Sequence, residues 1–201
     1  MTPSELTEAL EVLQRSGVVS APTDTLVGLL ARAREATAVS RVLAIKGAER
    51  QAPLPVLVAD LEMALSLSER FPESARELAA RGWPGPMTLI VLVRPGVFPA
   101  GVTAGRSTVG LRVPGPSPAL DIVRALGEPL TGTSANRSGH VPPQSSAALD
   151  PAVASAVDLV IAGTSPVGLA STVIDVTGEK PSVLRQGSFR LEGKDTSNGH
   201  S

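Results

Sequence analysis

The chain has 201 residues, of which 42% are hydrophobic, 18 are basic and 19 are acidic, and it contains no cysteine and two histidines. The lack of cysteine excludes a disulfide framework and a thiolate metal site, and two histidines are too few for a zinc cluster. Because the net charge is −1, the composition does not indicate the basic surface that is typical of nucleic-acid-binding proteins.

The first predicted element is an N-terminal helix. Thr2, Pro3 and Glu5 have the spacing of an N-cap, a first-turn proline and a capping-box partner. Apolar residues then recur at helical spacing, and Gly17 is predicted to end the helix.

Strands and helices are predicted to alternate after this helix. A short strand covers 18–22, and the pattern of 23–31 predicts a loop with a turn at Gly28. The further predicted helices cover 38–46, 61–67, 72–80 and 120–126. The further predicted strands cover 54–60, 87–93, 107–114, 157–163, 171–177 and 182–187, and 129–143 is predicted to be a strand that runs into a polar, glycine-rich loop.

These elements indicate one α/β domain with a mixed sheet and flanking helices. Several of the strands are apolar throughout, which is typical of strands that are covered on both faces. We expect a single domain over residues 1–190 and a flexible polar tail over 191–201. No apolar run approaches the ~20 residues that a membrane span needs, and the start lacks a basic region before an apolar one. We therefore expect a cytoplasmic protein without a signal peptide.

Common nucleotide-binding and hydrolytic motifs are missing from the sequence. It contains no G-x-x-x-x-G-K-[ST] and no G-x-G-x-x-G after a strand, and it lacks H-E-x-x-H and G-x-S-x-G. Phosphate chemistry in this chain would therefore need another scaffold.

Polar residues instead gather at strand ends and loops. They are mainly hydroxyls, with one lysine, two arginines, one amide and one carboxylate: Thr23, Asp24, Thr25, Lys46, Thr108, Arg112, Ser134, Asn136, Ser138, Ser171, Thr172 and Arg185. Thr108 and Arg112 are four apart on one predicted strand and thus share a face. Cationic side chains that compensate charge, beside hydroxyls that orient oxygens, favour recognition of an anion such as phosphate.

Each of these residues also has a purely structural interpretation. Lys46 at a helix C-terminus interacts favourably with the helix dipole without any ligand. Ser134 and Asn136 are typical of turn hydrogen bonds, and Arg112 and Arg185 are explained equally well by exposed edge strands. The local sequence leaves these alternatives open.

Seven motifs together resemble a known family. APTDTLVGL, IKG followed by PLPVLV, WPGPMTLIV, STVGLRVP, TSANRSG, STVIDV and VLRQG occur between about Val18 and Gly187, in the order seen in the threonylcarbamoyl-AMP synthases, the YrdC/Sua5 family. The resemblance implies a twisted α/β sheet around a concave, positively charged cavity. It also implies a nucleotidyltransferase that makes threonylcarbamoyl-AMP and pyrophosphate from L-threonine, bicarbonate and ATP, with Mg²⁺ accompanying ATP, for t6A37 modification of tRNA.

The resemblance also implies roles for individual residues. The catalytic residues would be Lys46, Ser134 and Asn136. The nucleotide would be bound by the same three residues together with Arg50, Thr108 and Arg185. L-Threonine would be bound by Thr25, Arg112, Gly132 and Ser171, and no protein metal site is implied.

This chain departs from the family pattern at a few positions. The arginine of the family's K-x-R motif falls at Ala48, and Arg50 stands two residues later. Val27 replaces a frequent aromatic residue, Ala52 a frequent Lys or Asn, and Leu57 the His of some members. The alternative is therefore a divergent relative that binds nucleotide or RNA without synthase activity. Binding to the downstream tRNA threonylcarbamoyl-transfer complex also stays open, and longer members carry a C-terminal domain that a chain of this length is not expected to have.

Overall fold

The structure is a computed structural model that describes residues 1–47 and 52–190. Ala48 and Arg50, and the tail predicted over 191–201, lie outside the described residues. The helices are α1 (Pro3–Gln14), α2 (Ala36–Lys46), α3 (Leu61–Leu67), α4 (Glu73–Gly82), α5 (Ala100–Thr103), α6 (Pro118–Leu126), α7 (Pro151–Ala154) and the 3₁₀ turn η1 (Ser146–Ala148). The helices predicted from apolar spacing are confirmed, with ends shifted by a few residues.

The N-terminus of α1 forms the predicted capping box. The Thr2 hydroxyl accepts a hydrogen bond from the Glu5 amide at 3.2 Å, and the Glu5 carboxylate accepts one from the Thr2 amide at 2.7 Å. The hydrogen bonds to Thr2 lower the pKa of Glu5. The helix ends at Gln14, three residues before Gly17.

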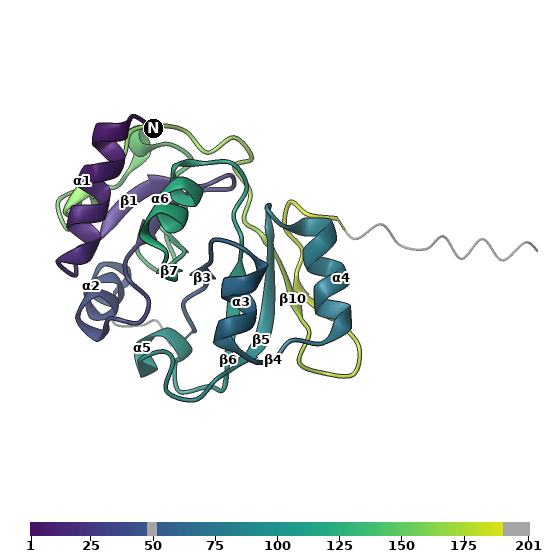
Figure 1. The fold of residues 1–201 in the computed structure, drawn as a ribbon. Coiled ribbons are helices and arrows are strands. Elements are labelled where there is room, and N and C mark those ends of the chain that lie inside the picture. The colour runs from purple at the N-terminus through teal and green to yellow at the C-terminus, as the bar shows by residue number, and fades with distance from the viewer. Residues whose placement is uncertain (48–51, 191–201) are drawn as a thin grey trace, which may run out of the picture.

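The strands of the described residues form a four-stranded and a seven-stranded sheet (Figure 1). The first has the order β8 (Thr133–Ser134), β2 (Val27–Leu30), β1 (Val19–Pro22), β9 (Leu159–Val160). The second has the order β11 (Ser182–Arg185), β10 (Thr172–Asp175), β5 (Met87–Val93), β6 (Thr108–Arg112), β3 (Val56–Leu57), β7 (Leu130–Thr131), and β4 (Ser68–Arg70) pairs with β5. Both sheets contain parallel and antiparallel pairs, so the predicted mixed α/β architecture is confirmed.

The loop predicted over 23–31 is wrong. Residues 27–30 form β2, which pairs antiparallel with β1 on one side and with β8 on the other, and Gly28 lies opposite both Ala21 and Ser134. All four residues of β2 are buried. A central strand covered on both faces has no polar–apolar alternation, and the glycine inside it is what suggested a turn.

The strand predicted over 54–60 is shorter in the structure. Only Val56 and Leu57 pair, with β6 on one side and β7 on the other. Pro53 and Pro55 lack the backbone N–H that a ladder needs, and the Leu54 amide between them donates to the Val102 carbonyl. The strand therefore begins after the second proline.

The helices pack on the outer sides of the sheets (Figure 1). α1 contacts α6 and β1, α6 contacts β1, and α4 contacts β5. One continuous cluster of buried apolar residues includes side chains from both sheets. No helix among the described residues has the length and apolar character to cross a membrane.

Candidate active site

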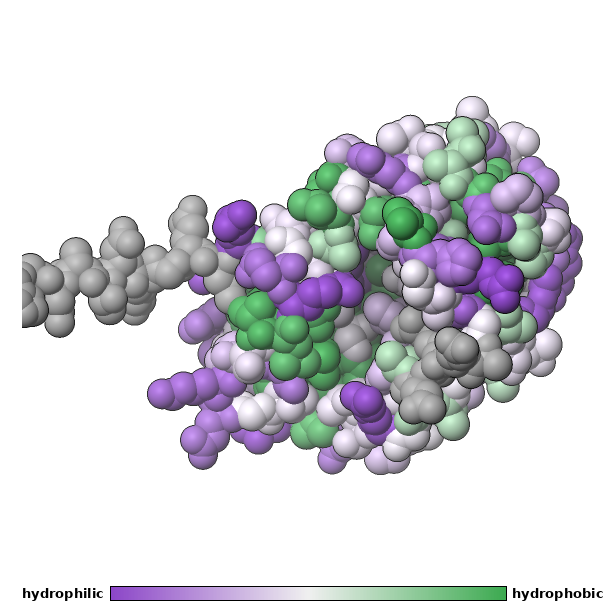
Figure 2. All heavy atoms as spheres, turned by 180° about the vertical axis from the view of Figure 1, so that it is seen from behind, coloured by the Kyte–Doolittle hydropathy of each residue, from purple (hydrophilic) through white to green (hydrophobic). Residues whose placement is uncertain are grey.

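A cavity of about 160 Å³ lies where the two sheets meet. The surface shown in Figure 2 is hollowed between the two halves of the molecule. The lining residues come from β1–β2, β3, β5, β6, β8 and the two C-terminal strands: Thr23, Thr25, Leu26, Val27, Gly28, Pro55, Leu57, Thr88, Arg112, Gly132, Thr133, Ser134, Ala170, Ser171 and Arg185. The fold thus brings together Thr25, Arg112, Gly132, Ser134, Ser171 and Arg185, six of the residues singled out in the sequence.

Arg112 is the buried cation of this cavity. It ends β6, which lies between β5 and β3, so the edge-strand interpretation of Arg112 is wrong. Its side chain donates to the Gly85 carbonyl at 2.9 Å, to the Thr25 hydroxyl at 2.9 Å and to the Asp24 carboxylate at 2.5 Å. Burial lowers the pKa of the Arg112 guanidinium, and the Asp24 carboxylate opposes that change.

The turn before β2 supplies two hydroxyls beside Arg112. The hydroxyls of Thr23 and Thr25 are 3.0 Å apart, and the Thr23 hydroxyl also accepts from the amides of Thr25 and Leu26. The Thr25 carbonyl in turn accepts from the Gly168 amide. The Thr25 hydroxyl is therefore fixed in orientation before any ligand enters.

A second cation, Arg185, approaches from β11. Its guanidinium donates to the Ser171 carbonyl at 3.0 and 3.2 Å and to the Ser171 hydroxyl at 3.3 Å. That hydroxyl lies 2.8 Å from the hydroxyl of Thr88 on β5. Partial burial lowers the pKa of Arg185, whose charge in turn contributes to lowering the pKa of Arg112. β11 is an edge strand and Arg185 is exposed, as its structural interpretation supposed, but the residue also lines the cavity.

Lys46 lies beside the cavity and is linked to it through Ser134. Its side chain is 3% exposed, and Nζ donates to the Ser134 carbonyl at 2.8 Å and to Asn136 Oδ1 at 3.1 Å. Ser134 itself lines the cavity. The helix dipole alone thus does not account for Lys46, because its ammonium group donates to Ser134 of β8, 88 residues further along the chain.

Asn136 uses all of its hydrogen-bonding groups. Oδ1 accepts from Lys46 and from the Ser134 hydroxyl, while Nδ2 donates to the carbonyls of Arg137 and His140 at 2.9 and 2.7 Å. The turn interpretation of Asn136 is therefore correct, and it is compatible with a site role, since the same amide holds Lys46.

Gly132 provides close packing rather than a polar group. A Cβ atom at Gly132 would lie 2.6 Å from Leu57 Cγ, well inside van der Waals contact. Leu57 and Val27, two positions that depart from the family pattern, are both buried and both line the cavity. Leu57, which pairs with Arg112 across β3 and β6, and Val27 thus add apolar side chains to the cavity lining.

Three of the predicted residues that the structure describes are not among those that line the cavity: Lys46 and Asn136, which are linked to it through Ser134, and Thr108. Thr108 starts β6 opposite Leu92 and is not among the residues that line the cavity. It shares a strand with Arg112, but four residues of an extended strand separate them by about 13 Å. Arg50 lies outside the described residues.

The sequence analysis did not single out Thr88, and it named Asp24 among the polar residues at strand ends without assigning it a site role. Thr88 lies in an otherwise apolar strand and inside the WPGPMTLIV motif, to which the sequence analysis assigned no site residue. Asp24 has a local signal, because it stands between Thr23 and Thr25.

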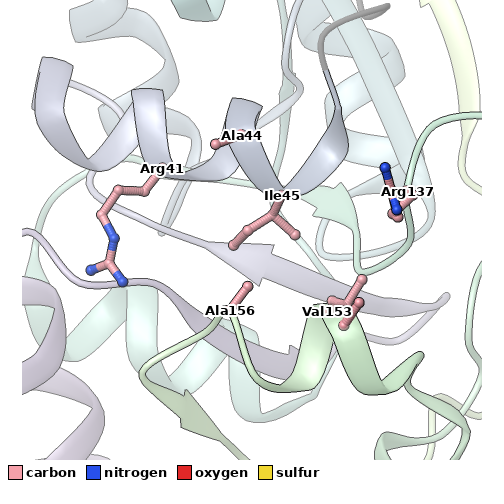
Figure 3. Close-up of a pocket in the computed structure, with 7 residues that line it drawn as sticks. Arg41, Ala44, Ile45, Arg137, Val153 and Ala156 are labelled. Carbon is pink, nitrogen blue, oxygen red and sulfur yellow. The ribbon is translucent and has the colours of Figure 1, made fainter.

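A larger hollow of about 370 Å³ lies between α2 and α7 (Figure 3). Its lining is mostly small and apolar, with an arginine at either end: Arg41, Ala44, Ile45, Arg137, Ala152, Val153 and Ala156. Arg41 is engaged by Asp158 at 2.7 Å. The hollow lacks the buried hydroxyls that would orient a polar ligand, so we assign the chemistry to the cavity between the sheets.

The donor set of the cavity does not fit a resident divalent metal. Among the described residues, no group of three or more His, Cys, Asp or Glu side chains could hold a metal ion, and none of those that line the cavity carries a carboxylate. Magnesium prefers carboxylates, phosphates and water as ligands.

Sequence comparisons place this chain among well-defined relatives. The Sua5/YciO/YrdC family model, described as telomere recombination, matches residues 11–187. The chain is 35% identical over 192 residues to the threonylcarbamoyl-AMP synthase of Bacillus subtilis, covering 94% of this chain and 55% of that protein. It is 36% identical to the putative threonylcarbamoyl-AMP synthase of Mycobacterium tuberculosis H37Rv, covering 93% and 86%.

A comparison with solved structures also finds a similar Sua5 protein. The crystal structure of Pyrococcus abyssi Sua5 complexed with L-threonine matches with a TM-score of 0.84 at 34% identity, over 90% of this chain and 54% of that one. The chain spans about half the length of the first of these relatives and of the solved Sua5 chain.

Proposed function

This chain belongs to the Sua5/YciO/YrdC family, and from that premise we propose that it is an L-threonylcarbamoyladenylate synthase. Its substrates would be L-threonine, bicarbonate and MgATP, and its products threonylcarbamoyl-AMP and pyrophosphate. The observation that carries the proposal is the cavity, in which Arg112 is presented beside the hydroxyls of Thr25 and Ser171. An arginine beside fixed hydroxyls complements an amino acid that has a carboxylate and a hydroxyl group.

In the proposed reaction, the unprotonated amine of threonine attacks the carbon of bicarbonate, and water leaves to give a carbamate. A carbamate oxygen then attacks the α-phosphorus of ATP in line, and the bond between the α-phosphorus and its bridging oxygen breaks to release pyrophosphate. Neither step needs a protein nucleophile. Catalysis would come from positioning and charge compensation.

The residues would divide this work between two ends of the site. Arg112 would hold the threonine carboxylate, with Thr25, Ser171 and the close-packed wall at Gly132 shaping its pocket. Lys46, Ser134, Asn136 and Arg185 would face the nucleotide phosphates. Arg50 and Thr108 remain expected nucleotide contacts.

Two features support this division. Ser134 belongs both to the cavity lining and to the hydrogen bonds of Lys46, so it connects the two ends. The relative from Pyrococcus abyssi was solved with L-threonine bound. The product would be passed to the tRNA threonylcarbamoyl-transfer machinery, and we propose that the protein acts in the cytoplasm.

The test is threonine- and bicarbonate-dependent release of pyrophosphate by the purified protein. We expect release in the wild type and in Lys180→Ala, a matched control whose lysine is exposed and is not among the residues that line the cavity. Lys46→Ala should reduce the rate by roughly a hundredfold or more, since preorganised charge at a phosphoryl site has that value.

The rival function, a divergent nucleotide-binding relative, is motivated by Ala48 in place of the K-x-R arginine. Nucleotide binding by the wild type without any pyrophosphate release would favour it over the synthase. A large gain in rate in Ala48→Arg would indicate that Arg50 does not replace the missing arginine.

A further inference from the structure

The guanidinium of Arg112 is held on three sides by the protein. It has five N–H groups, and the described residues take three hydrogen bonds from it, at the Gly85 carbonyl, the Thr25 hydroxyl and the Asp24 carboxylate. Because Arg112 also lines the cavity, the remaining N–H groups are the ones available to an anion there. The three partners thus decide which way the guanidinium presents them.

Asp24 is the charged partner among the three. Its side chain is buried, like that of Arg112, and the two form an ion pair with a separation of 2.5 Å. Asp24 itself is not among the residues that line the cavity. It therefore acts on the cavity only through Arg112.

The second oxygen of Asp24 is placed by packing. Oδ2 is buried and has no hydrogen-bond partner among the described residues. It faces Gly115, where an added Cβ would lie 3.0 Å from both Asp24 Cβ and Oδ2 and 3.1 Å from Cγ. Asp24 cannot easily retreat from such a group, because its Cβ is fixed by the backbone and its carbonyl accepts from the Val167 amide.

We propose that Asp24 is a positioning residue that fixes the guanidinium of Arg112 for a substrate carboxylate. Gly115, in turn, leaves the space that the side chain of Asp24 requires. The proposal rests on the proposed function for the identity of that substrate, L-threonine. The arrangement has a second consequence. Asp24 balances the charge of Arg112, so the pair presents directed N–H donors with no net charge, and Arg185 supplies the net positive charge of the cavity lining.

The test compares Asp24→Asn and Gly115→Ala with Asp158→Asn. The control is matched because it makes the same substitution in another arginine–aspartate pair, Arg41–Asp158, that lies outside the cavity. Isothermal titration calorimetry of the full chain measures the affinities for L-threonine and for an ATP analogue. Nitrogen-15 NMR of the arginine Nε–H groups, without ligand, measures how rapidly the Nε proton of Arg112 exchanges with water.

We expect Asp24→Asn to weaken threonine binding by roughly ten- to a hundredfold, as misplacement of a binding group does, and to leave the affinity for the ATP analogue unchanged. Gly115→Ala should weaken threonine binding less, because it displaces Asp24 by only a few tenths of an ångström. Exchange at Arg112 Nε–H should accelerate in Asp24→Asn, and Asp158→Asn should change none of these quantities.

The proposal is overturned if folded Asp24→Asn binds threonine as the wild type does, or if its Arg112 Nε–H exchanges as slowly as in the wild type. If Asp24→Asn does not fold, Gly115→Ala decides by the same two measurements. Failure of the proposed function can be told apart from failure of this proposal, because the wild type itself would then not bind threonine. In that case the exchange of Arg112 Nε–H, which needs no ligand, would decide the role of Asp24.

Discussion

Gly132 shows how a residue without a side chain shapes the cavity. It lies between β7 and β8, and the space where its Cβ would stand is filled by Leu57, whose Cγ and Cδ2 would be 2.6 and 2.7 Å away. Leu57 is 1% exposed and is part of the core as well as of the cavity lining. Any side chain at position 132 would therefore have to push Leu57 toward the cavity.

We predict that Gly132→Ala lowers the free energy of unfolding by about 1–3 kcal/mol, the usual cost of overpacking, and weakens L-threonine binding. Gly28→Ala is the matched control, because the first neighbour of its added Cβ is at 3.5 Å, an ordinary contact in the same cavity lining. Urea unfolding and calorimetry of both variants provide the measurement. Equal effects of the two substitutions would contradict the steric argument.

At the same scale, the sequence identified the residue types of the site better than their contacts. Lys46, Arg112 and Ser171 were singled out as polar residues at the ends of elements, and the fold brings them to one region. The sequence could not decide between dipole and ligand interpretations of Lys46, because its partners Ser134 and Asn136 lie about 90 residues away. Thr88 lies in the WPGPMTLIV motif but was assigned no role, since only tertiary pairing of β5 with β10 brings it to Ser171.

At the level of the elements, the sequence predicted strands that have a long apolar run of their own. It did not predict well the strands that form only because neighbouring strands pair with them. β5 is a run of seven apolar or β-branched residues and is central in its sheet, as expected. β2 was taken for a loop because Gly28 interrupts it, and β3, β7, β8 and β9 are two residues long. Such short strands exist because neighbouring strands pair with them, and that information is not local.

Asp158 connects three elements and carries a prediction about pH. Its carboxylate accepts from the Val18 amide just before β1 at 2.7 Å and pairs with Arg41 of α2, while the Asp158 amide donates to the Val18 carbonyl. The hydrogen bond from Arg41, helped by that from Val18, lowers the pKa of Asp158 in the folded state. A carboxylate with a depressed folded pKa stabilises the protein above its unfolded pKa, and this contribution is lost as the pH falls through the folded value.

We therefore expect the stability of the wild type to fall with pH below about 4, near the ordinary pKa of aspartate, partly through Asp158. Asp158→Asn should be less stable than the wild type at pH 7, and the difference between the two should shrink as the pH falls from about 4 toward 2. Urea midpoints at a series of pH values measure this. A difference that stays constant over that range would show that the Asp158 charge is not involved.

At the scale of the whole molecule, the cavity depends on both sheets. Thr25, Gly28 and Ser134 come from the four-stranded sheet or its turns, and Thr88, Arg112 and Arg185 come from the seven-stranded sheet. The resemblance read from seven scattered motifs is confirmed by the family match over 11–187, and it predicted a concave site that local secondary structure alone would not. A ligand in this cavity touches both sheets and should stabilise them as one unit.

Binding of a ligand across both sheets should raise the temperature of thermal unfolding. A ligand that binds only the folded state at a hundred times its Kd adds about 2.7 kcal/mol. For a domain of this size, that corresponds to an increase in Tm of roughly 5–10 °C. We expect such an increase with L-threonine and a further one with a non-hydrolysable ATP analogue, measured by scanning calorimetry.

Substitutions should affect the increase in Tm with L-threonine and the increase with the ATP analogue separately, because the two ligands are proposed to use different parts of the site. Lys46→Ala should lose the increase in Tm caused by the ATP analogue and keep the increase caused by L-threonine. Lys46 donates to Ser134 and Asn136, whereas Arg112 donates to other residues, including Gly85 and Thr25. D-Threonine should give a smaller increment than L-threonine, because the Arg112 donors and the Thr25 hydroxyl are fixed in orientation before binding. If Lys46→Ala abolished both increments while folded, the cavity would bind its ligands as a single site, and the division between a threonine end and a phosphate end would be wrong.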